Sequence, residues 1–121
     1  MLTKLELTLD CANATALAGF WKRAVGYVDA PQPAPLGVAW LVDPRGVAPS
    51  LCLLEVPEPK TVKNRLHVDL VVSGDGAPDE HWQRVTGEVA RLRAAGATLL
   101  AEYTGHHVVL ADPEGNEFCV T

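Results

Sequence analysis

The chain has 121 residues and a formal net charge of −5, with ten basic against fifteen acidic side chains. This length fits one domain that buries a hydrophobic core without cross-links. The acidic balance argues against nucleic acid or an anionic membrane as the main partner, because both are bound by cationic surfaces. No apolar run approaches the roughly 20 residues of a bilayer-spanning helix. The three cysteines are too few for a disulfide scaffold, so we expect a cytoplasmic protein with reduced thiols.

The first half of the chain predicts a strand, a helix and two further strands. Residues 3–9 alternate apolar and polar side chains, which is typical of a strand with one buried face. Asn13 is the expected N-cap and Gly26 the expected stop of a helix that lies between them. Three prolines within residues 31–35 break regular structure. Two strands are expected after them, at 37–43 and 49–56, joined by the turn DPRG.

A polar connector at 57–64 precedes a return of the same order of elements. Residues 65–72, RLHVDLVV, predict a strand whose apolar face carries Leu66, Val68 and Leu70. Its other face carries Arg65, His67 and Asp69. A helix is expected next, with Asp79 as its cap, Gly96 as its stop, and Trp82, Val85, Val89 and Leu92 along its apolar face. The last three strands are expected at 97–103, 106–112 and 116–121.

The two halves of the chain form an internal repeat. The segment LELTL at 5–9 aligns with LHVDL at 66–70, and the turn DPRG at 43–46 aligns with DPEG at 112–115. Each half therefore predicts the order β-α-β-β-β, and two such halves complete one domain. The expected boundaries are module one at 1–56, the connector at 57–64, and module two at 65–121.

The repeat also predicts which polar side chains share a function. It places Glu6 opposite His67 and Thr8 opposite Asp69 in the alignment. Because the apolar face of each first strand packs on its own helix, we expect these polar side chains to face a cleft shared by the two modules.

Two tandem modules of this kind resemble the vicinal-oxygen-chelate superfamily, which contains glyoxalase I, bleomycin-resistance proteins and extradiol dioxygenases. The resemblance is greatest to its small bacterial glyoxalase-like domains. Three segments carry it: LDCANATALAGFW at 9–21, VPEPKTVKNRLHVDL at 56–70 and LADPEGNEFCV at 110–120. The resemblance implies an α+β fold in which two βαβββ modules form an open, cleft-enclosing eight-stranded mixed sheet with two helices outside. It also implies a small-molecule ligand and a homodimer.

The resemblance further implies a set of metal ligands. In metal-bearing members of the superfamily the ligands lie on the first and last strands of each module. Transferred to this chain, that pattern places ligands at Glu6, His67 and Cys119, with a fourth at Cys52 or Leu54. Two cysteines make a softer ligand set than the histidines and carboxylates of glyoxalases. This favours zinc over nickel or iron and argues against glyoxalase I activity itself. A site without metal is the alternative.

Other side chains are candidates for contact with a ligand or for proton transfer. In an enzyme, Asp69 or Glu102 is expected to move the proton. Only one of the neighbours His106 and His107 can face the cleft, because successive residues of a strand point to opposite faces. The side chains expected to contact the ligand are Arg65, His67, Asp69 and Trp40.

Three functions fit these features. The first is metal-dependent lyase or isomerase chemistry on a substrate with vicinal oxygens. The second is a protein that binds and sequesters a small molecule without chemistry, as in drug resistance. The third is a regulatory or assembly module without a ligand. The sequence leaves open whether the protein is an enzyme.

Overall fold

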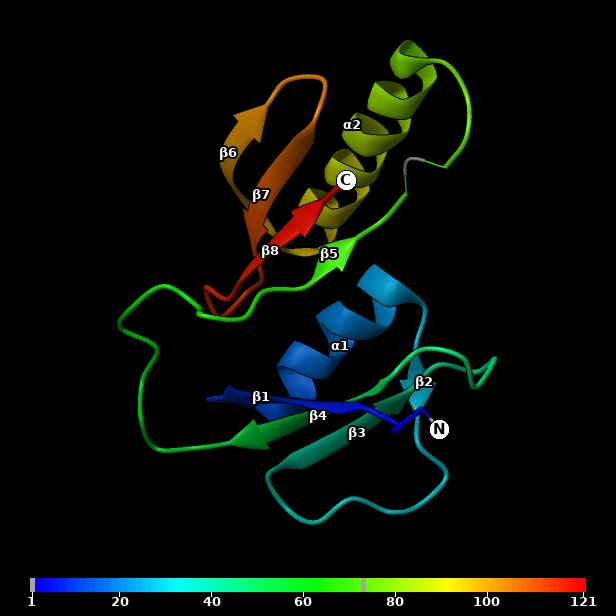
Figure 1. Ribbon diagram of the computed structural model, residues 1–121. Coiled ribbons are helices and arrows are strands. Elements are labelled where there is room, and N and C mark those ends of the chain that lie inside the picture. The colour runs from blue at the N-terminus through cyan, green and yellow to red at the C-terminus, as the bar shows by residue number, and fades with distance from the viewer. Residues whose placement is uncertain (1, 73) are drawn as a thin grey trace. The chain divides into compact units, whose positions relative to one another are not determined.

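The computed structural model describes residues 2–72 and 74–121 and divides into two compact units, one ending at Pro59 and the other starting at Lys60. Each unit contains one helix and one four-stranded mixed sheet in the order β-α-β-β-β (Figure 1). The predicted tandem βαβββ architecture is therefore confirmed, with the eight strands in two four-stranded sheets. From here on these units are module one and module two. Each is described by itself, and the expected shared cleft stays a prediction.

Module one consists of β1 (Glu6–Cys11), α1 (Ala14–Val25), β2 (Val28–Asp29), β3 (Val38–Val42) and β4 (Ser50–Glu55). Its sheet has the order β1-β4-β3-β2, in which β1 runs parallel to β4 and the other neighbours are antiparallel. The short strand β2 lies in the segment for which no regular structure was predicted. It forms there because Val28 and Asp29 pair with β3 before the prolines begin.

Helix α1 begins and ends at the predicted residues. The side chain of Asn13 accepts a hydrogen bond from the Ala16 N–H at 3.0 Å, and Gly26 ends the helix with a φ of 75°. A second carboxylate, not predicted, also lies at the helix start, where Glu55 Oε2 accepts a hydrogen bond from the Ala14 N–H at 2.9 Å. The apolar stripe of α1 covers one face of the sheet, and this core contains Leu17, Phe20, Trp21, Leu41 and Leu53.

Module two consists of β5 (Asp69–Leu70), α2 (Pro78–Ala95), β6 (Thr98–Tyr103), β7 (His107–Ala111) and β8 (Glu117–Val120). Its sheet has the order β5-β8-β7-β6 and repeats the parallel pairing of first and last strands seen in module one. Helix α2 packs on β7 and β8. The core between them contains Val85, Leu92, Val108, Leu110, Phe118 and Val120.

Strand β5 is shorter than the predicted strand at 65–72. The main-chain pairing with β8 begins at Val68, whose carbonyl accepts a hydrogen bond from the Cys119 N–H at 3.0 Å. Before that point the Asn64 N–H donates to the Glu117 side chain instead, so the ladder does not extend further back. The prediction that Leu66 belongs to the core is therefore wrong, and its side chain is 74% exposed.

The start of α2 also differs from the prediction. The helix begins at Pro78 with Ala77 as its cap, and Asp79 lies in the first turn instead of at the cap. Proline favours the first helical position because its φ is already helical and its missing N–H is not needed there. Trp82 is half-buried and does not reach the core occupied by Val85 and Leu92.

The two Asp-Pro-x-Gly segments are turns, as predicted. In each turn the glycine N–H donates to the aspartate carbonyl at 2.9 Å, from Gly46 to Asp43 and from Gly115 to Asp112. Both aspartate side chains are buried and accept hydrogen bonds from the backbone that follows them. The repeat therefore includes the turns as well as the strands.

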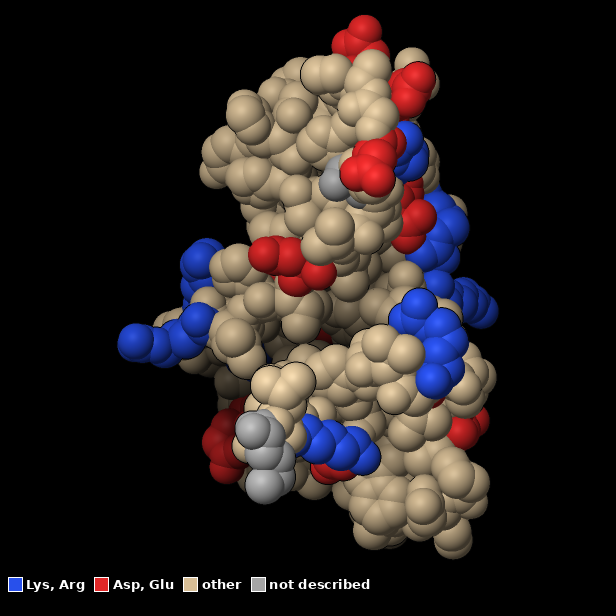
Figure 2. Space-filling view, turned by 45° about the vertical axis from the view of Figure 1, so that its right-hand side comes forward, with Lys and Arg blue, Asp and Glu red and all other residues tan. Residues whose placement is uncertain are grey.

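Within the described residues, neither helix has the length and apolar character needed to cross a membrane. On the face shown in Figure 2, most of the surface is uncharged, and the acidic and basic side chains form small separate groups.

Candidate functional site

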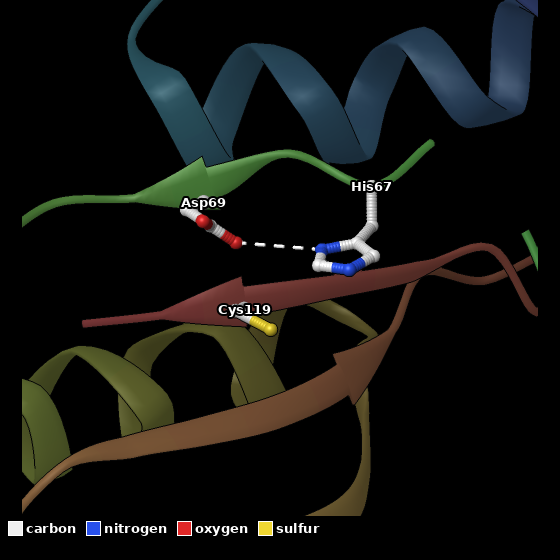
Figure 3. A group of neighbouring side chains, drawn as sticks. All are labelled: His67, Asp69 and Cys119. Atoms are coloured by element: carbon white, nitrogen blue, oxygen red, sulfur yellow. Dashed lines mark ion pairs between the residues drawn. The ribbon is translucent and has the colours of Figure 1, made fainter. Parts of the chain in front are cut away.

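Module two brings together three potential metal ligands. His67, Asp69 and Cys119 each direct one ligand atom into a group in which all three atoms lie within 4.8 Å of one another. His67 and Asp69 belong to the segment that enters and forms β5, and Cys119 comes from β8 (Figure 3). Asp69 and Cys119 are direct partners in the parallel pairing of these strands. Two donors from the paired strands β5 and β8 and one from the segment just before β5 therefore lie close together.

Strand alternation explains why these side chains share a face. Val108 pairs with Val120 and Leu110 with Phe118, and all four side chains are buried on the side that α2 covers. Cys119 lies between two of these core residues on β8, so its side chain points to the opposite face. Asp69 is the direct partner of Cys119 and takes the same face.

The three side chains differ in exposure and interact with one another. The His67 Nδ1 atom lies 3.4 Å from Asp69 Oδ1, and these side chains are 41% and 55% exposed. Cys119 is 8% exposed. Burial raises the pKa of the Cys119 thiol, and the neighbouring Asp69 carboxylate raises it further by its charge and by accepting a hydrogen bond. The free thiol is therefore held in its protonated form, which is a weak nucleophile.

This arrangement fits a divalent metal with an open coordination position. Zinc binds nitrogen, oxygen and sulfur ligands at about 2.0–2.3 Å, which places tetrahedral ligand atoms about 3.5 Å apart. The observed group is wider, with its ligand atoms within 4.8 Å of one another, and the His67 and Asp69 side chains are 41% and 55% exposed. If these three side chains held a zinc ion, they would leave one of its usual four positions for a substrate oxygen or water. One imidazole, one carboxylate and one thiol make a set that suits zinc better than manganese or iron.

Sequence reasoning missed a residue that positions the start of this site. Glu117 Oε1 accepts a hydrogen bond from the Lys60 ammonium at 3.0 Å, and Oε2 accepts one from the Asn64 N–H at 2.9 Å. Although burial acts to raise the pKa of Glu117, these hydrogen bonds outweigh it and hold the pKa below its usual value. Glu117 thereby ties the connector to β8 just before His67. The sequence signal is the spacing of two residues between Glu117 and Cys119 on β8, which places both side chains on one face of the sheet.

The strand register identifies the equivalent positions in module one. Cys52 pairs with Thr8 on β1, as Cys119 pairs with Asp69 on β5. Cys52, and not Leu54, is therefore the counterpart of Cys119. On the other side Cys52 pairs with Trp40, where Cys119 pairs with Val109. Module one thus has Thr8, Cys52 and Trp40 in the row that holds Asp69, Cys119 and Val109 in module two.

In module one, Trp40 and Cys52 line a pocket. Among the residues the structure describes, the group of at least three close metal-ligating side chains is the one in module two. Module one has an open pocket of about 380 Å³ on its sheet. Its lining includes Trp40, Cys52, Glu6, Lys4, Gln32 and Ser50. Glu6 and Cys52, both predicted as metal ligands, line this pocket, and a metal role for them stays a prediction.

The remaining predicted site residues take different places. Glu102 pairs with Val108, so it lies on the face of the module-two sheet opposite Asp69, and its carboxylate accepts a hydrogen bond from the Thr104 hydroxyl. The structure therefore does not bring Glu102 and Asp69 together. Arg65 is exposed and precedes β5.

The adjacent residues His106 and His107 also lie in different places, one in a turn and the other on a strand. His107 and Val109 are two residues apart on β7, so their side chains point to the same face of the sheet. Val109 pairs with Cys119, and His107 therefore shares the face of the His67 cluster. Its ring stacks on Tyr103 with a centroid separation of 4.6 Å. His106 lies in the exposed turn between β6 and β7.

Comparison with known proteins identifies the family of this chain. Residues 6–121 match the sequence profile of the Glyoxalase-like domain. The chain belongs to this family. No curated protein sequence matches it significantly.

Several solved structures share the fold at low sequence identity. A glyoxalase/bleomycin resistance protein/dioxygenase family enzyme from Burkholderia phytofirmans PsJN superposes with a TM-score of 0.74 at 18% identity, covering 98% of this chain and 97% of that one. A possible glyoxalase from Bacillus cereus gives 0.69 at 17% identity, covering 100% and 99%. The fosfomycin resistance protein FosX from Listeria monocytogenes gives 0.72 at 13% identity, covering 99% and 93%. A mutant of FosX has been solved with Mn(II) and 1S,2S-dihydroxypropylphosphonic acid.

Proposed function

We propose that this glyoxalase-like domain binds a small molecule with vicinal oxygens at a zinc ion held by His67, Asp69 and Cys119. The observation that carries the proposal is the convergence of three different donor atoms within 4.8 Å on one sheet face. The 1S,2S-dihydroxypropylphosphonic acid that is present with Mn(II) in the structure of a FosX mutant has oxygens on adjacent carbons. Zinc supplies a Lewis acid that polarises a coordinated oxygen.

Each side chain of the cluster has a distinct part in holding the metal. Asp69 lies beside both the His67 ring and the Cys119 thiol. Before metal binds, its carboxylate orients the imidazole and accepts a hydrogen bond from the thiol. Cys119 is buried in β8 and provides the rigid anchor of the set. His67, at 41% side-chain exposure, has the freedom to complete the site. Loss of the thiol proton accompanies metal binding, because the thiolate is the ligand.

Under this proposal, lyase or isomerase chemistry needs a proton-transferring residue that is not itself a ligand. Asp69 is occupied as a ligand and Glu102 lies on the other face. His107 shares the face of the cluster and is oriented by its stacking on Tyr103. His107 is therefore the candidate for this proton transfer, on the ground that it shares the sheet face of the cluster.

The test is the metal content of protein purified without chelators or a metal-affinity tag, measured by elemental analysis. We expect about one zinc per chain in the wild type, loss of zinc in His67→Ala, and no loss in His106→Ala, a histidine in the exposed turn of the same module. Wild-type protein that contains no metal and also refuses added zinc, nickel and manganese would contradict the proposal.

A binding protein without chemistry is the second candidate, and the position of Glu102 favours it. With Glu102 on the opposite face, one of the two predicted proton-transfer residues is absent from the site. In this case a zinc-loaded protein binds vicinal diols or hydroxyketones without converting them, and His107→Ala leaves binding unchanged. The homodimer and the cytoplasmic location stay predictions, and the native mass in solution tests the first of them.

A further inference from the structure

We propose that the ligand of the module-two site is a 2-hydroxy or 2-oxo acid, whose carboxylate pairs with the ammonium group of Lys63. This inference rests on the proposed zinc site and adds the chemical class of its ligand. Such an acid has oxygens on adjacent carbons and also carries a negative charge. Lys63 and the three residues of the cluster all belong to module two.

The position of Lys63 in the connector is the first observation that carries this proposal. Glu117 Oε1 accepts a hydrogen bond from the Lys60 ammonium at 3.0 Å, and Oε2 accepts one from the Asn64 N–H at 2.9 Å. The Lys60 ammonium also donates to the Val62 carbonyl at 2.8 Å. Lys63 therefore lies between two residues that are held by one carboxylate. That carboxylate shares a sheet face with the cysteine of the cluster, so this part of the connector runs beside the cluster.

The charge of Lys63 is the second observation. Lys60 pairs with Glu117, whereas no carboxylate in the part of the chain that the structure describes forms an ion pair with the exposed Lys63. Burial raises the pKa of the Cys119 thiol most and the Asp69 carboxylate raises it further, while the Lys63 ammonium acts in the opposite direction. A charge has such an effect on a thiol when it lies near it. Lys63 is therefore a cation without a counter-charge next to the cluster.

The charge balance of the zinc-loaded site explains why this cation selects the ligand. The Asp69 carboxylate and the Cys119 thiolate together balance the two positive charges of the zinc ion, and His67 binds as a neutral imidazole. The loaded site then has no net charge to attract an anion, and the chain as a whole is acidic. Lys63 supplies the missing positive charge. It favours an acid over a neutral diol or hydroxyketone, which would leave the ammonium unpaired.

Two probes of nearly the same shape test this charge preference: L-lactate and L-lactamide. Both have a hydroxyl group next to a carbonyl carbon, and only lactate is charged. The zinc content of each protein is measured first, and each probe is then titrated into the isotopically labelled, zinc-loaded protein. Chemical-shift changes at residues 64–69 and 117–120 report binding. Because a carboxylate is itself a zinc ligand, the quantity compared between variants is the ratio of the lactate and lactamide affinities.

Variants of Lys63 separate its charge from that of the metal. Lys63→Met removes the charge and keeps most of the side chain, so we expect the affinity ratio to fall about threefold, a typical effect for an exposed charge pair. Lys63→Arg keeps the charge and the ratio. Arg93→Met is the matched control, because it removes one positive charge from the last turn of α2, the helix on the other face of the sheet, and leaves the ratio unchanged. Thermal melts confirm that each variant is folded.

The two proposals fail in different ways. Wild-type protein that takes up no zinc overturns the proposed function and this inference with it. The inference alone is overturned if the zinc-loaded protein does not bind lactate at millimolar concentration, if Lys63→Met keeps the wild-type ratio, or if Arg93→Met lowers the ratio as much as Lys63→Met does. In these cases the zinc site itself still stands.

Discussion

The two modules share one backbone plan but use the same positions for different side chains. Each pairs its first strand with its last, covers one sheet face with a helix, and leaves the other face with a cysteine at its centre. Around Cys119, module two has His67 and Asp69, which gather into a potential ligand set. Around Cys52, module one has Thr8 and Trp40. A repeated fold therefore fixes where side chains meet, and a few substitutions decide what they bind.

The largest effect is expected when module two receives the side chain of module one. Asp69→Thr copies the residue at the equivalent position, Thr8, and removes one of the three donors together with the hydrogen-bond partner of Cys119. We expect zinc affinity to fall by more than about 100-fold, because loss of a ligand costs more than the roughly 10- to 100-fold loss seen for a residue that only supports a ligand. Competition with a chromophoric chelator measures it.

The matched control for this change is Thr8→Ala in module one, for which zinc affinity should stay within twofold of the wild type. Equal losses of affinity in both variants would show that the two modules do not differ in the way proposed.

The aspartates of the two repeated turns provide a second comparison. Asp112 is 2% exposed and accepts hydrogen bonds from the Glu114 and Asn116 N–H groups and from the Asn116 side chain. Asp112→Ala leaves these buried donors without an acceptor, so we expect a loss of about 2–3 kcal/mol in the free energy of unfolding. Urea denaturation measures this loss, and a change below about 0.5 kcal/mol would mean that the turn is held by its backbone alone.

The corresponding turn in module one, which contains Asp43, should contribute to the free energy of unfolding in a pH-dependent way. Hydrogen bonds from the Arg45 side chain, and from the Ala48 and Arg45 N–H groups, hold the pKa of Asp43 far below its usual range. A depressed folded-state pKa contributes stability above the unfolded value of about 3.9 and loses it as the pH falls below that value. Asp43→Asn should therefore be less stable than the wild type at pH 7.

The difference in unfolding free energy between these two proteins should narrow below about pH 4, because Asp43 then binds a proton in the unfolded wild type while it stays ionised in the folded protein. Urea denaturation at pH 7, 5 and 3 tests this. A difference that stays constant across these pH values would show that the Asp43 charge does not contribute.

The parts of the fold that follow from local physics could be predicted from the sequence. Helix α1 was predicted to within a residue, because Asn13 and Gly26 mark its ends by their own chemistry. The tandem β-α-β-β-β order followed from the repeated strand and turn segments. The start of β5 was missed, since alternation in RLHVDLVV continues past the point where Glu117 captures the Asn64 N–H. That contact joins residues 53 positions apart and has no local signal.

The candidate site could be predicted only in part, because some of its features depend on the pairing of strands that are distant in the sequence. Alternation placed His67 and Asp69 on one face, and the resemblance drew attention to Cys119. The choice between Cys52 and Leu54 required the register of β1 with β4, because both side chains have the same parity on their strand. The separation of Glu102 from Asp69 required the pairing of β6 with β7, which decides which residue of β6 takes each face.

The most direct test of the central claim exploits the two equivalent cysteines. Cobalt(II) substituted for zinc gives an intense sulfur-to-metal charge-transfer band only when a thiolate is a ligand, so its absorption spectrum reports the cysteine at the metal. Wild type and Cys52→Ser are predicted to show this band at about one cobalt per chain, and Cys119→Ser to lack it. A band that survives in Cys119→Ser, or that disappears in Cys52→Ser, would contradict a metal site built by module two alone.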